Sequence, residues 1–323
     1  MNTSSQHRIA YVNGEFVPES EASISIRDKG LVYGDCVFDT ARTFAGEIFR
    51  LDAHLDRLYR NLGYAQIDPG IDQAEMARLT LEVVQRNLPV LRPGEDFWVT
   101  QRVTSGQQIL DGDLDQRIGA TLIIDCIPLP LRARARYFKD GIETVVAQRK
   151  RISPDALSAN IKSNNYLNMM LAQREVQISH PNAWALMCDE NGNIAEGAGC
   201  NFFVVLDGEV FTPTADYVLD GVSRQVVIDL CNRISIPVHE TTISLDDAMD
   251  ADEAFFTSTS LCICPVRQLN GKQLRASGEA DSGEPFCQPV TRKITDAFKQ
   301  EVGLDFVGQY LDHLSDSTVS TGL

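Results

Sequence analysis

The chain has 323 residues, of which 43% are hydrophobic and 23% charged, a composition typical of globular proteins and not of disordered ones. Its 45 acidic and 29 basic residues give a net charge of −16, which disfavours a protein that binds nucleic-acid backbones. No stretch approaches the ~20 apolar residues of a membrane helix, and no apolar signal-peptide segment follows Met1, so we expect no membrane association.

The first part of the chain interleaves strand and helix signals. A hairpin is expected at 9–17, where Asn13 and Gly14 supply a turn with positive φ. Asp52 is expected to be the N-cap of a helix that carries leucines at helical spacing. The other elements predicted here are strands at 36–44, 47–50, 97–104 and 121–127 and a helix at 71–88.

Pro128 and Pro130 interrupt this pattern, and the arginine-rich stretch that follows predicts an interdomain linker at 129–141. The linker separates an N-terminal domain at 1–128 from a C-terminal domain at 142–323. Short mixed strands with many hairpins favour α+β domains over a doubly wound parallel sheet. The elements predicted in the C-terminal domain are strands at 142–148, 184–188, 201–206, 209–212 and 253–257 and helices at 166–178, 222–234 and 290–302.

The eight cysteines indicate no metal centre. None forms a Cys-x-x-Cys pair and no histidine cluster accompanies them, so the spacing typical of zinc sites is missing. Most lie inside apolar runs, where free cysteine packs as a small hydrophobic residue. We therefore expect no metal and a reduced, cytoplasmic setting.

Lys162 stands between a polar loop and the start of the helix at 166–178, and three further segments give it a chemical context. In the Glu-Gly-Ala-Gly run that begins at Glu196, small residues let backbone approach a flat ligand and leave one carboxylate among them. The Gly-Val-Ser sequence that ends at Ser223 opens a helix, whose free N–H groups form an anion site. Arg57 lies on a helix whose apolar face is buried. Taken singly, these fit an ordinary surface lysine, a glycine turn, a helix cap and a solvated arginine.

In this combination and order the chain resembles the fold-type IV, or class IV, aminotransferases that depend on pyridoxal 5'-phosphate (PLP). The resemblance covers about residues 9 to 303, and the branched-chain aminotransferases are the nearest subfamily. It implies a two-domain α+β fold of the D-amino-acid-aminotransferase type, with PLP as cofactor. It also implies a homodimer, because members of the family complete each pocket with a loop from the partner.

The resemblance assigns a role to each residue of the cofactor site. Lys162 matches the lysine that binds PLP covalently, and Glu196 matches the acid bonded to the pyridine nitrogen. Arg57 matches the phosphate-binding arginine. The remaining cofactor-binding residues are, by the same resemblance, Tyr166, Val222, Ser223 and Thr259. The tyrosine follows the lysine by four residues, one fewer than in some branched-chain members.

Candidate substrate residues lie on and before the strand at 36–44 and on the strand at 97–104, where alternate side chains share a face. An arginine on such a face either binds a substrate carboxylate or pairs with an acidic neighbour. The candidates are Tyr33, Phe38, Thr40, Arg42, Trp98 and Arg102. An amino acid with an apolar side chain and one carboxylate suits this face.

Departures from the subfamily patterns leave the amino donor open. Trp98-Val-Thr-Gln replaces the Tyr-x-Arg-Pro of the branched-chain type, and Thr104-Ser-Gly replaces the Thr-Arg-Gly of the D-amino-acid type. We expect a transaminase that moves an amino group from a branched-chain-like amino acid to a 2-oxo acid. A D-amino-acid or (R)-amine transaminase and a lyase resembling aminodeoxychorismate lyase are the alternatives.

Overall fold

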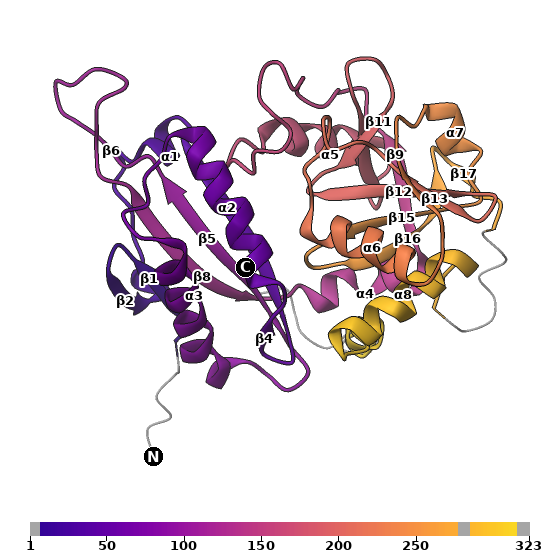
Figure 1. Ribbon diagram of the computed structural model, residues 1–323, viewed down its shortest axis with the longest axis horizontal. Coiled ribbons are helices and arrows are strands. Elements are labelled where there is room, and N and C mark those ends of the chain that lie inside the picture. The colour runs from indigo at the N-terminus through magenta and orange to yellow at the C-terminus, as the bar shows by residue number, and fades with distance from the viewer. Residues whose placement is uncertain (1–6, 277–284, 315–323) are drawn as a thin grey trace. The chain divides into compact units, whose positions relative to one another are not determined.

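The computed structural model describes residues 7–276 and 285–314, and the chain divides into two compact units (Figure 1). The first unit ends at Leu129 but also includes Ile161–Asn165, and the second comprises Pro130–Asn160 and the chain from Tyr166 onward. Each unit mixes helices with strands. Lys162 was predicted to lie in the C-terminal domain. In the structure it belongs to the first unit, because residues 161–165 run beside a strand of that unit.

The first unit is built on a six-stranded antiparallel sheet with the order β2-β1-β8-β5-β3-β4. Its strands are β1 (Ile9–Val12), β2 (Glu15–Pro18), β3 (Cys36–Phe44), β4 (Glu47–Ile48), β5 (Phe97–Thr104) and β8 (Thr121–Pro128). A separate small ribbon joins β6 (Gln107–Gln108) to β7 (Arg117–Ile118). The predicted bounds of β3 and β5 are those observed, because both strands alternate clearly and end at turn residues.

Helices α2 (Leu51–Ala65) and α3 (Gln73–Asn87) cover one face of this sheet, and the core lies between them and the strands. Leu58 and Val83 from the helices and Val99 and Val103 from β5 are fully buried there. Truncating such a leucine to alanine typically costs about 3 kcal/mol. Helix α2 begins after Arg50, which has left-handed backbone angles, so the predicted N-cap at Asp52 is wrong. A short helix, α1 (Lys29–Val32), precedes β3.

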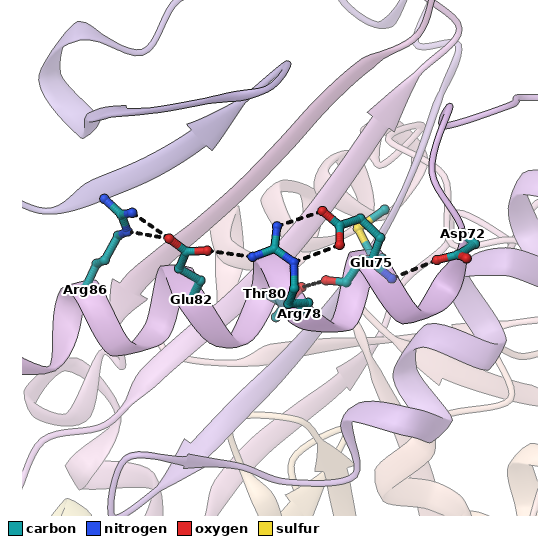
Figure 2. Close-up of polar contacts among 7 residues, drawn as sticks. Asp72, Glu75, Arg78, Thr80, Glu82 and Arg86 are labelled. Atoms are coloured by element: carbon teal, nitrogen blue, oxygen red, sulfur yellow. Dashed lines mark hydrogen bonds and ion pairs between the residues drawn. The ribbon is translucent and has the colours of Figure 1, made fainter.

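Figure 2 shows the start and the outer face of α3. The carboxylate of Asp72 caps the helix by accepting a hydrogen bond from the backbone of Glu75. Arg78 then pairs with Glu75 and Glu82 one turn away on either side, and Glu82 pairs with Arg86. These exposed pairs follow helical spacing and leave the opposite face of α3 for the core.

The second unit contains a nine-stranded mixed sheet with the order β11-β10-β9-β16-β15-β12-β13-β14 and β17 beside β16. Because β11 also pairs with β12, a closed ring is formed by the strands β11, β10, β9, β16, β15 and β12. Its strands are β9 (Ile142–Val146), β10 (Trp184–Cys188), β11 (Ile194–Gly197), β12 (Cys200–Leu206), β13 (Glu209–Thr212), β14 (Val238–Glu240), β15 (Glu253–Ser258), β16 (Cys262–Leu269) and β17 (Lys272–Gln273).

Six helices accompany this sheet within the described residues: α4 (Leu131–Asp140), α5 (Leu167–Ser179), α6 (Val222–Arg233), α7 (Leu245–Met249), α8 (Pro289–Val302) and α9 (Phe306–Leu311). Helix α4 occupies the segment predicted as a linker. Its Leu131, Ala135 and Phe138 are buried on one stripe, and Phe138 stacks on Tyr310 of α9 with ring centroids 4.3 Å apart. The arginines that suggested a linker lie between these apolar positions and leave the stripe intact.

Two kinds of feature are absent from the described ranges, 7–276 and 285–314. No helix in them is long and apolar enough to cross a bilayer. In the same residues, no group of three or more His, Cys, Asp or Glu side chains is placed to hold a metal ion. The eight cysteines, all of which lie in the described ranges, form no disulfide, and seven of them are buried.

Candidate active site

Lys162 is held against β3 by backbone contacts on both sides of it. The amide of Phe38 donates to the carbonyl of Lys162 at 2.9 Å, and the amide of Asn164 donates to the carbonyl of Cys36 at 3.0 Å. Ser163 forms an isolated bridge with Val37. The Lys162 Nζ atom lies 4.7 Å from the centre of the Phe38 ring. The amine is therefore placed on the face of the sheet that carries Phe38.

Most of the candidate substrate residues share that face. Phe38, Thr40 and Arg42 of β3 lie directly opposite Arg102, Thr100 and Trp98 of β5. Residues directly opposite in an antiparallel pair point to the same side, and the hydroxyl groups of Thr40 and Thr100 are 3.2 Å apart. The other face carries Val37, Val99 and Val103, which belong to the core under α2 and α3.

Arg42 and Tyr33 are already engaged by neighbouring groups. The Arg42 side chain is only 2% exposed; its Nε donates to the Thr43 carbonyl at 3.0 Å, and its guanidinium lies 4.0 Å from the Phe44 ring centre. It also lies 3.8 Å from the Asp96 carboxylate. Tyr33 follows α1 and is exposed, and its hydroxyl accepts a hydrogen bond from Gln108 at 2.6 Å.

Arg57 is not a solvated helix arginine but part of a buried ionic cluster. Its Nε and Nη2 donate to the two oxygens of Asp39 at 2.7 and 2.8 Å, and His54 Nδ1 lies 2.7 Å from Asp39 Oδ1. Burial alone would raise the pKa of Asp39, but the Arg57 guanidinium and His54 hold it well below its usual range. Burial lowers the pKa of His54, because it outweighs the attraction of Asp39. Asp39 was not predicted from the sequence.

Glu196 is a buried acid of the second unit. It lies on β11, the strand that closes the ring, and is 2% exposed. Its Oε1 accepts from Arg151 Nε at 2.7 Å and its Oε2 accepts from the Leu219 amide at 3.1 Å. Asn201 lies opposite Glu196 on β12. The contact between Arg151 and Glu196 was not predicted from the sequence. The signal that could have indicated it is the basic run at 149–151, which offers a cation for a buried carboxylate.

The loop before α6 is held by hydrogen bonds to Asn201 of β12 and to Asn160. Asn201 Nδ2 donates to the Leu219 carbonyl at 2.8 Å, and Asn160 Oδ1 accepts from the Asp220 amide at 2.9 Å. The N-cap of α6 is Gly221, where an added Cβ would lie 2.2 Å from Asn201 Oδ1. Glycine lets the loop approach Asn201 and offers no side chain to cap the helix. The first amides of α6 are therefore available for an anion.

The remaining candidates of the second unit are partly buried. Val222 and Ser223 form the first turn of α6, and Thr259 lies between β15 and β16. Tyr166 precedes α5, and its ring lies 3.8 Å from the position of a Cβ built on Gly199. Tyr166 therefore stands beside the turn that joins Glu196 to Asn201 in the β11–β12 hairpin.

These two sets of residues fit the chemistry of PLP. Each carboxylate oxygen accepts two hydrogen bonds, so Glu196 keeps capacity for a pyridine N–H after binding Arg151 and Leu219. Within the second unit, Glu196 and the start of α6 have the chemistry to hold the ring nitrogen and the phosphate. Within the first unit, Arg57 and Lys162 are the cation and the amine that the resemblance assigns to the phosphate and to the covalent link. The donor set thus provides an acid, a helix N-terminus, an arginine and an amine.

Comparisons with known proteins agree with this chemistry. The family model described as amino-transferase class IV matches residues 36–269. A Methanocaldococcus jannaschii protein provisionally named as a branched-chain-amino-acid aminotransferase is 35% identical over 290 residues, covering 90% of this chain and 94% of that protein. D-alanine aminotransferase of Bacillus licheniformis is 27% identical over 294 residues, covering 90% and 95%.

The fold has close counterparts among solved structures. A branched-chain aminotransferase from the archaeon Thermoproteus uzoniensis, crystallised with norvaline, superposes with a TM-score of 0.80 at 26% identity, covering 95% of this chain and 97% of that one. The predicted fold class, enzyme class and cofactor are confirmed. The chain belongs to the class IV aminotransferases, the family of PLP-dependent enzymes that move amino groups between amino acids and 2-oxo acids.

Proposed function

We propose that this aminotransferase takes its amino group from an amino acid with an apolar, branched-chain-like side chain and passes it to a 2-oxo acid. The observation that supports the proposal most is the character of the sheet face beside Lys162. Phe38, Trp98, Ile123 and Ile127 are half-buried there, and the register of β3, β5 and β8 puts them on one side. Incompletely buried aromatic and aliphatic groups suit an apolar substrate side chain.

Lys162 is the proposed catalytic residue. When bound, PLP supplies an electron sink for the negative charge that develops at the substrate α-carbon. Lys162 Nζ would take the α-proton as general base and deliver it, as general acid, to the C4′ carbon of the bound cofactor. The backbone hydrogen bonds with Phe38 and Cys36 fix the position of the lysine beside β3. This restricts the positions that its amine can take before the reaction.

The other assigned residues bind and orient. Glu196 would hold a proton on the pyridine nitrogen, and the hydrogen bond from Arg151 keeps that carboxylate in place. By the resemblance to the family, Arg57, the first turn of α6 and Thr259 would bind the phosphate, and Tyr166 would contribute to the site of the ring. Thr40 and Trp98 face the substrate, and Arg42 lies buried on the same side of the sheet.

A D-amino-acid transaminase is the second candidate. It is supported by the relative from Bacillus licheniformis and by Thr100, which stands where the branched-chain pattern has arginine. A donor panel separates the two candidates. We expect L-leucine, L-isoleucine and L-valine to reduce the absorbance of the holoenzyme's bound cofactor faster than D-alanine does. Faster reaction with D-alanine would replace the first proposal by the second.

We propose that the working unit is a homodimer that forms through the first unit. The segments 24–33 and 106–118 lie together, because Lys29 N donates to the Gly106 carbonyl and Gln108 N donates to the Arg27 carbonyl. Both carry exposed apolar side chains: Ile24, Ile26, Leu31, Val32, Leu110, Leu114 and Ile118. An exposed apolar patch of this kind is typical of an interaction surface.

Sedimentation tests the dimer with a matched control. Ile26 and Ile178 are equally exposed, at 84%, but Ile178 lies on α5 of the second unit. Ile26→Asp should shift the protein to monomer at micromolar concentration, whereas Ile178→Asp should not. A wild-type protein that sediments as a monomer with full activity would refute the dimer.

A reducing compartment, the cytoplasm, is the setting we propose. None of the eight cysteines, which all lie in the described ranges, forms a disulfide, and seven are buried. Burial raises the pKa of Cys36 and of Cys231 to about 12, which keeps these thiols protonated. Fractionation of the native source cells, with the protein followed by antibody, tests the location.

A further inference from the structure

The turn that carries Thr259 lies at the end of the sheet where Glu196 and the loop before α6 are found. Glu196 of β11 pairs with Asn201 of β12, and Asn201 pairs with Thr257 of β15. These three residues form one row across the sheet, and Thr259 stands two residues beyond Thr257. Asn201 also binds the Leu219 carbonyl of that loop. The row therefore brings the turn and the loop to one end of the same strands.

The residue after Thr259 anchors this turn in the interior of the second unit. Thr259 is half-buried, whereas Ser260 is only 3% exposed. The Ser260 carbonyl accepts a hydrogen bond from the Tyr310 hydroxyl at 2.7 Å, and the Ser260 hydroxyl accepts one from Arg134 Nη1. Of two consecutive side chains, one is thus left partly accessible and the next belongs to a residue that is bonded to α9 and to α4.

The two helices that supply these donors are themselves packed together. Phe138 of α4 stacks on the ring of Tyr310, with centroids 4.3 Å apart, and Tyr310 is completely buried. Arg134 lies one turn before Phe138 on the same helix. One helix therefore carries both the ring that fixes Tyr310 and the guanidinium that reaches the turn. A packed support of this kind limits the positions that the backbone of the turn can take.

We propose that Arg134 and Tyr310 are positioning residues for the cofactor phosphate, because by holding Ser260 they fix the direction of the Thr259 hydroxyl and amide. The inference rests on the proposed assignment of Thr259 to the phosphate. Donors whose directions are set before a phosphate arrives bind it more tightly, since ordering them on binding costs free energy. Both residues act through the turn and not by contact with the cofactor.

Affinities for PLP and for pyridoxal, which lacks the phosphate, test this proposal on the full chain. Equilibrium dialysis should show PLP bound about tenfold more weakly by Arg134→Gln and about fivefold more weakly by Tyr310→Phe. The affinity for pyridoxal should not change in either variant. Arg136→Gln lies two residues along α4, where the arginine bonds to Asn182 and Tyr137. It is the matched control and should bind PLP like the wild type.

A double-mutant cycle separates this support from a general loss of structure. Ser260→Ala removes the hydroxyl that accepts from Arg134 and leaves the backbone carbonyl to Tyr310. The double variant Arg134→Gln/Ser260→Ala should weaken PLP binding no more than Arg134→Gln alone, because both changes remove one contact. Tyr310→Phe retains the ring that stacks on α4, and it serves if the arginine variant does not fold.

The phosphorus NMR signal of the bound cofactor gives a readout that does not depend on affinity. At saturating PLP the signal should move in Arg134→Gln and in Tyr310→Phe, because the donors around the phosphate are displaced. It should keep the wild-type position in Arg136→Gln. A signal unmoved in both of the first two variants would contradict the proposal.

Equal losses for PLP and pyridoxal, or an unchanged PLP affinity in both variants, would overturn the role of Arg134 and Tyr310. Failure of the underlying assignment would look different. In that case Thr259→Ala would bind PLP as tightly as the wild type does, and the proposal would fall with it. A weakened Thr259→Ala beside unaffected Arg134→Gln and Tyr310→Phe would overturn the proposal alone. The donor panel that tests the amino donor is independent of these cofactor affinities.

Discussion

Arg57 on α2 donates two hydrogen bonds to Asp39 on β3, from Nε at 2.7 Å and from Nη2 at 2.8 Å. The carboxylate is fully buried and also accepts from the Thr40 amide at 2.7 Å. The pair therefore joins the helix to the sheet and fixes the direction of the guanidinium. A residue assigned to the phosphate thus also has a structural partner in the core.

Removing the Asp39 charge should destabilise the fold. Asp39→Asn leaves Arg57 buried without a counter-ion, and breaking a buried pair from one side typically costs about 3 kcal/mol. Urea unfolding should show that loss as a lower midpoint with an unchanged slope. Glu82→Gln, in an exposed pair of α3, is the control and should hardly move the midpoint. Equal midpoints for Asp39→Asn and the wild type would show that the pair contributes nothing.

Acid should weaken the protein in two stages because of this cluster. The pKa of His54 is lowered in the fold, so stability is complete above its unfolded value of about 6.5 and falls as the pH drops below it. The pKa of Asp39 is also lowered, so its contribution is present above about 3.9 and is lost at lower pH.

His54→Gln isolates the first stage. The variant should lose the decline in stability between pH 7 and pH 5 that the wild type shows in thermal unfolding. His239→Gln, at an exposed position, is the matched control and should keep the wild-type slope. A His54→Gln variant with an unaltered pH dependence would contradict the account of the cluster.

Arg57→Ala should weaken cofactor binding by roughly ten- to a hundredfold, because one bidentate contact to a phosphate is worth about 1–3 kcal/mol. Equilibrium dialysis against PLP, under conditions where the variant is folded, measures the change. Arg60→Ala removes an exposed arginine from the same helix and should retain wild-type affinity. Full retention of PLP by Arg57→Ala after dialysis would remove Arg57 from the phosphate site.

Glu196→Gln should lower turnover far more than cofactor occupancy. The neutral amide no longer stabilises a protonated pyridine nitrogen, while the phosphate ligands at α6 are untouched. Single-turnover rates and PLP content on the same preparation check the two halves of this expectation. Unchanged turnover would refute the assignment of Glu196.

The sequence was sufficient for features that depend on local pattern. The bounds of β3 and β5 follow from alternation, and the start of α6 follows from the Gly-Val-Ser sequence. The segment at 129–141 was predicted as a linker because of its three arginines, whereas the structure has helix α4 there with a buried apolar stripe of Leu131, Ala135 and Phe138.

Partners that come from distant parts of the chain could not be predicted. Asp39 meets Arg57, Arg102 meets Asp125 and Arg151 meets Glu196 only after the strands have paired. Likewise, the position of Lys162 beside Phe38 depends on a short segment that returns to the first unit. Spacing along one chain carries no signal for such contacts.

The central claim, that Lys162 binds PLP covalently, is tested most directly by borohydride reduction of the holoenzyme followed by peptide mapping. The reduced protein should carry one phosphopyridoxyl group, on the tryptic peptide that contains Lys162, and Lys162→Ala should carry none. A phosphopyridoxyl group on any other lysine of the wild type, or one retained by Lys162→Ala, would contradict the assignment.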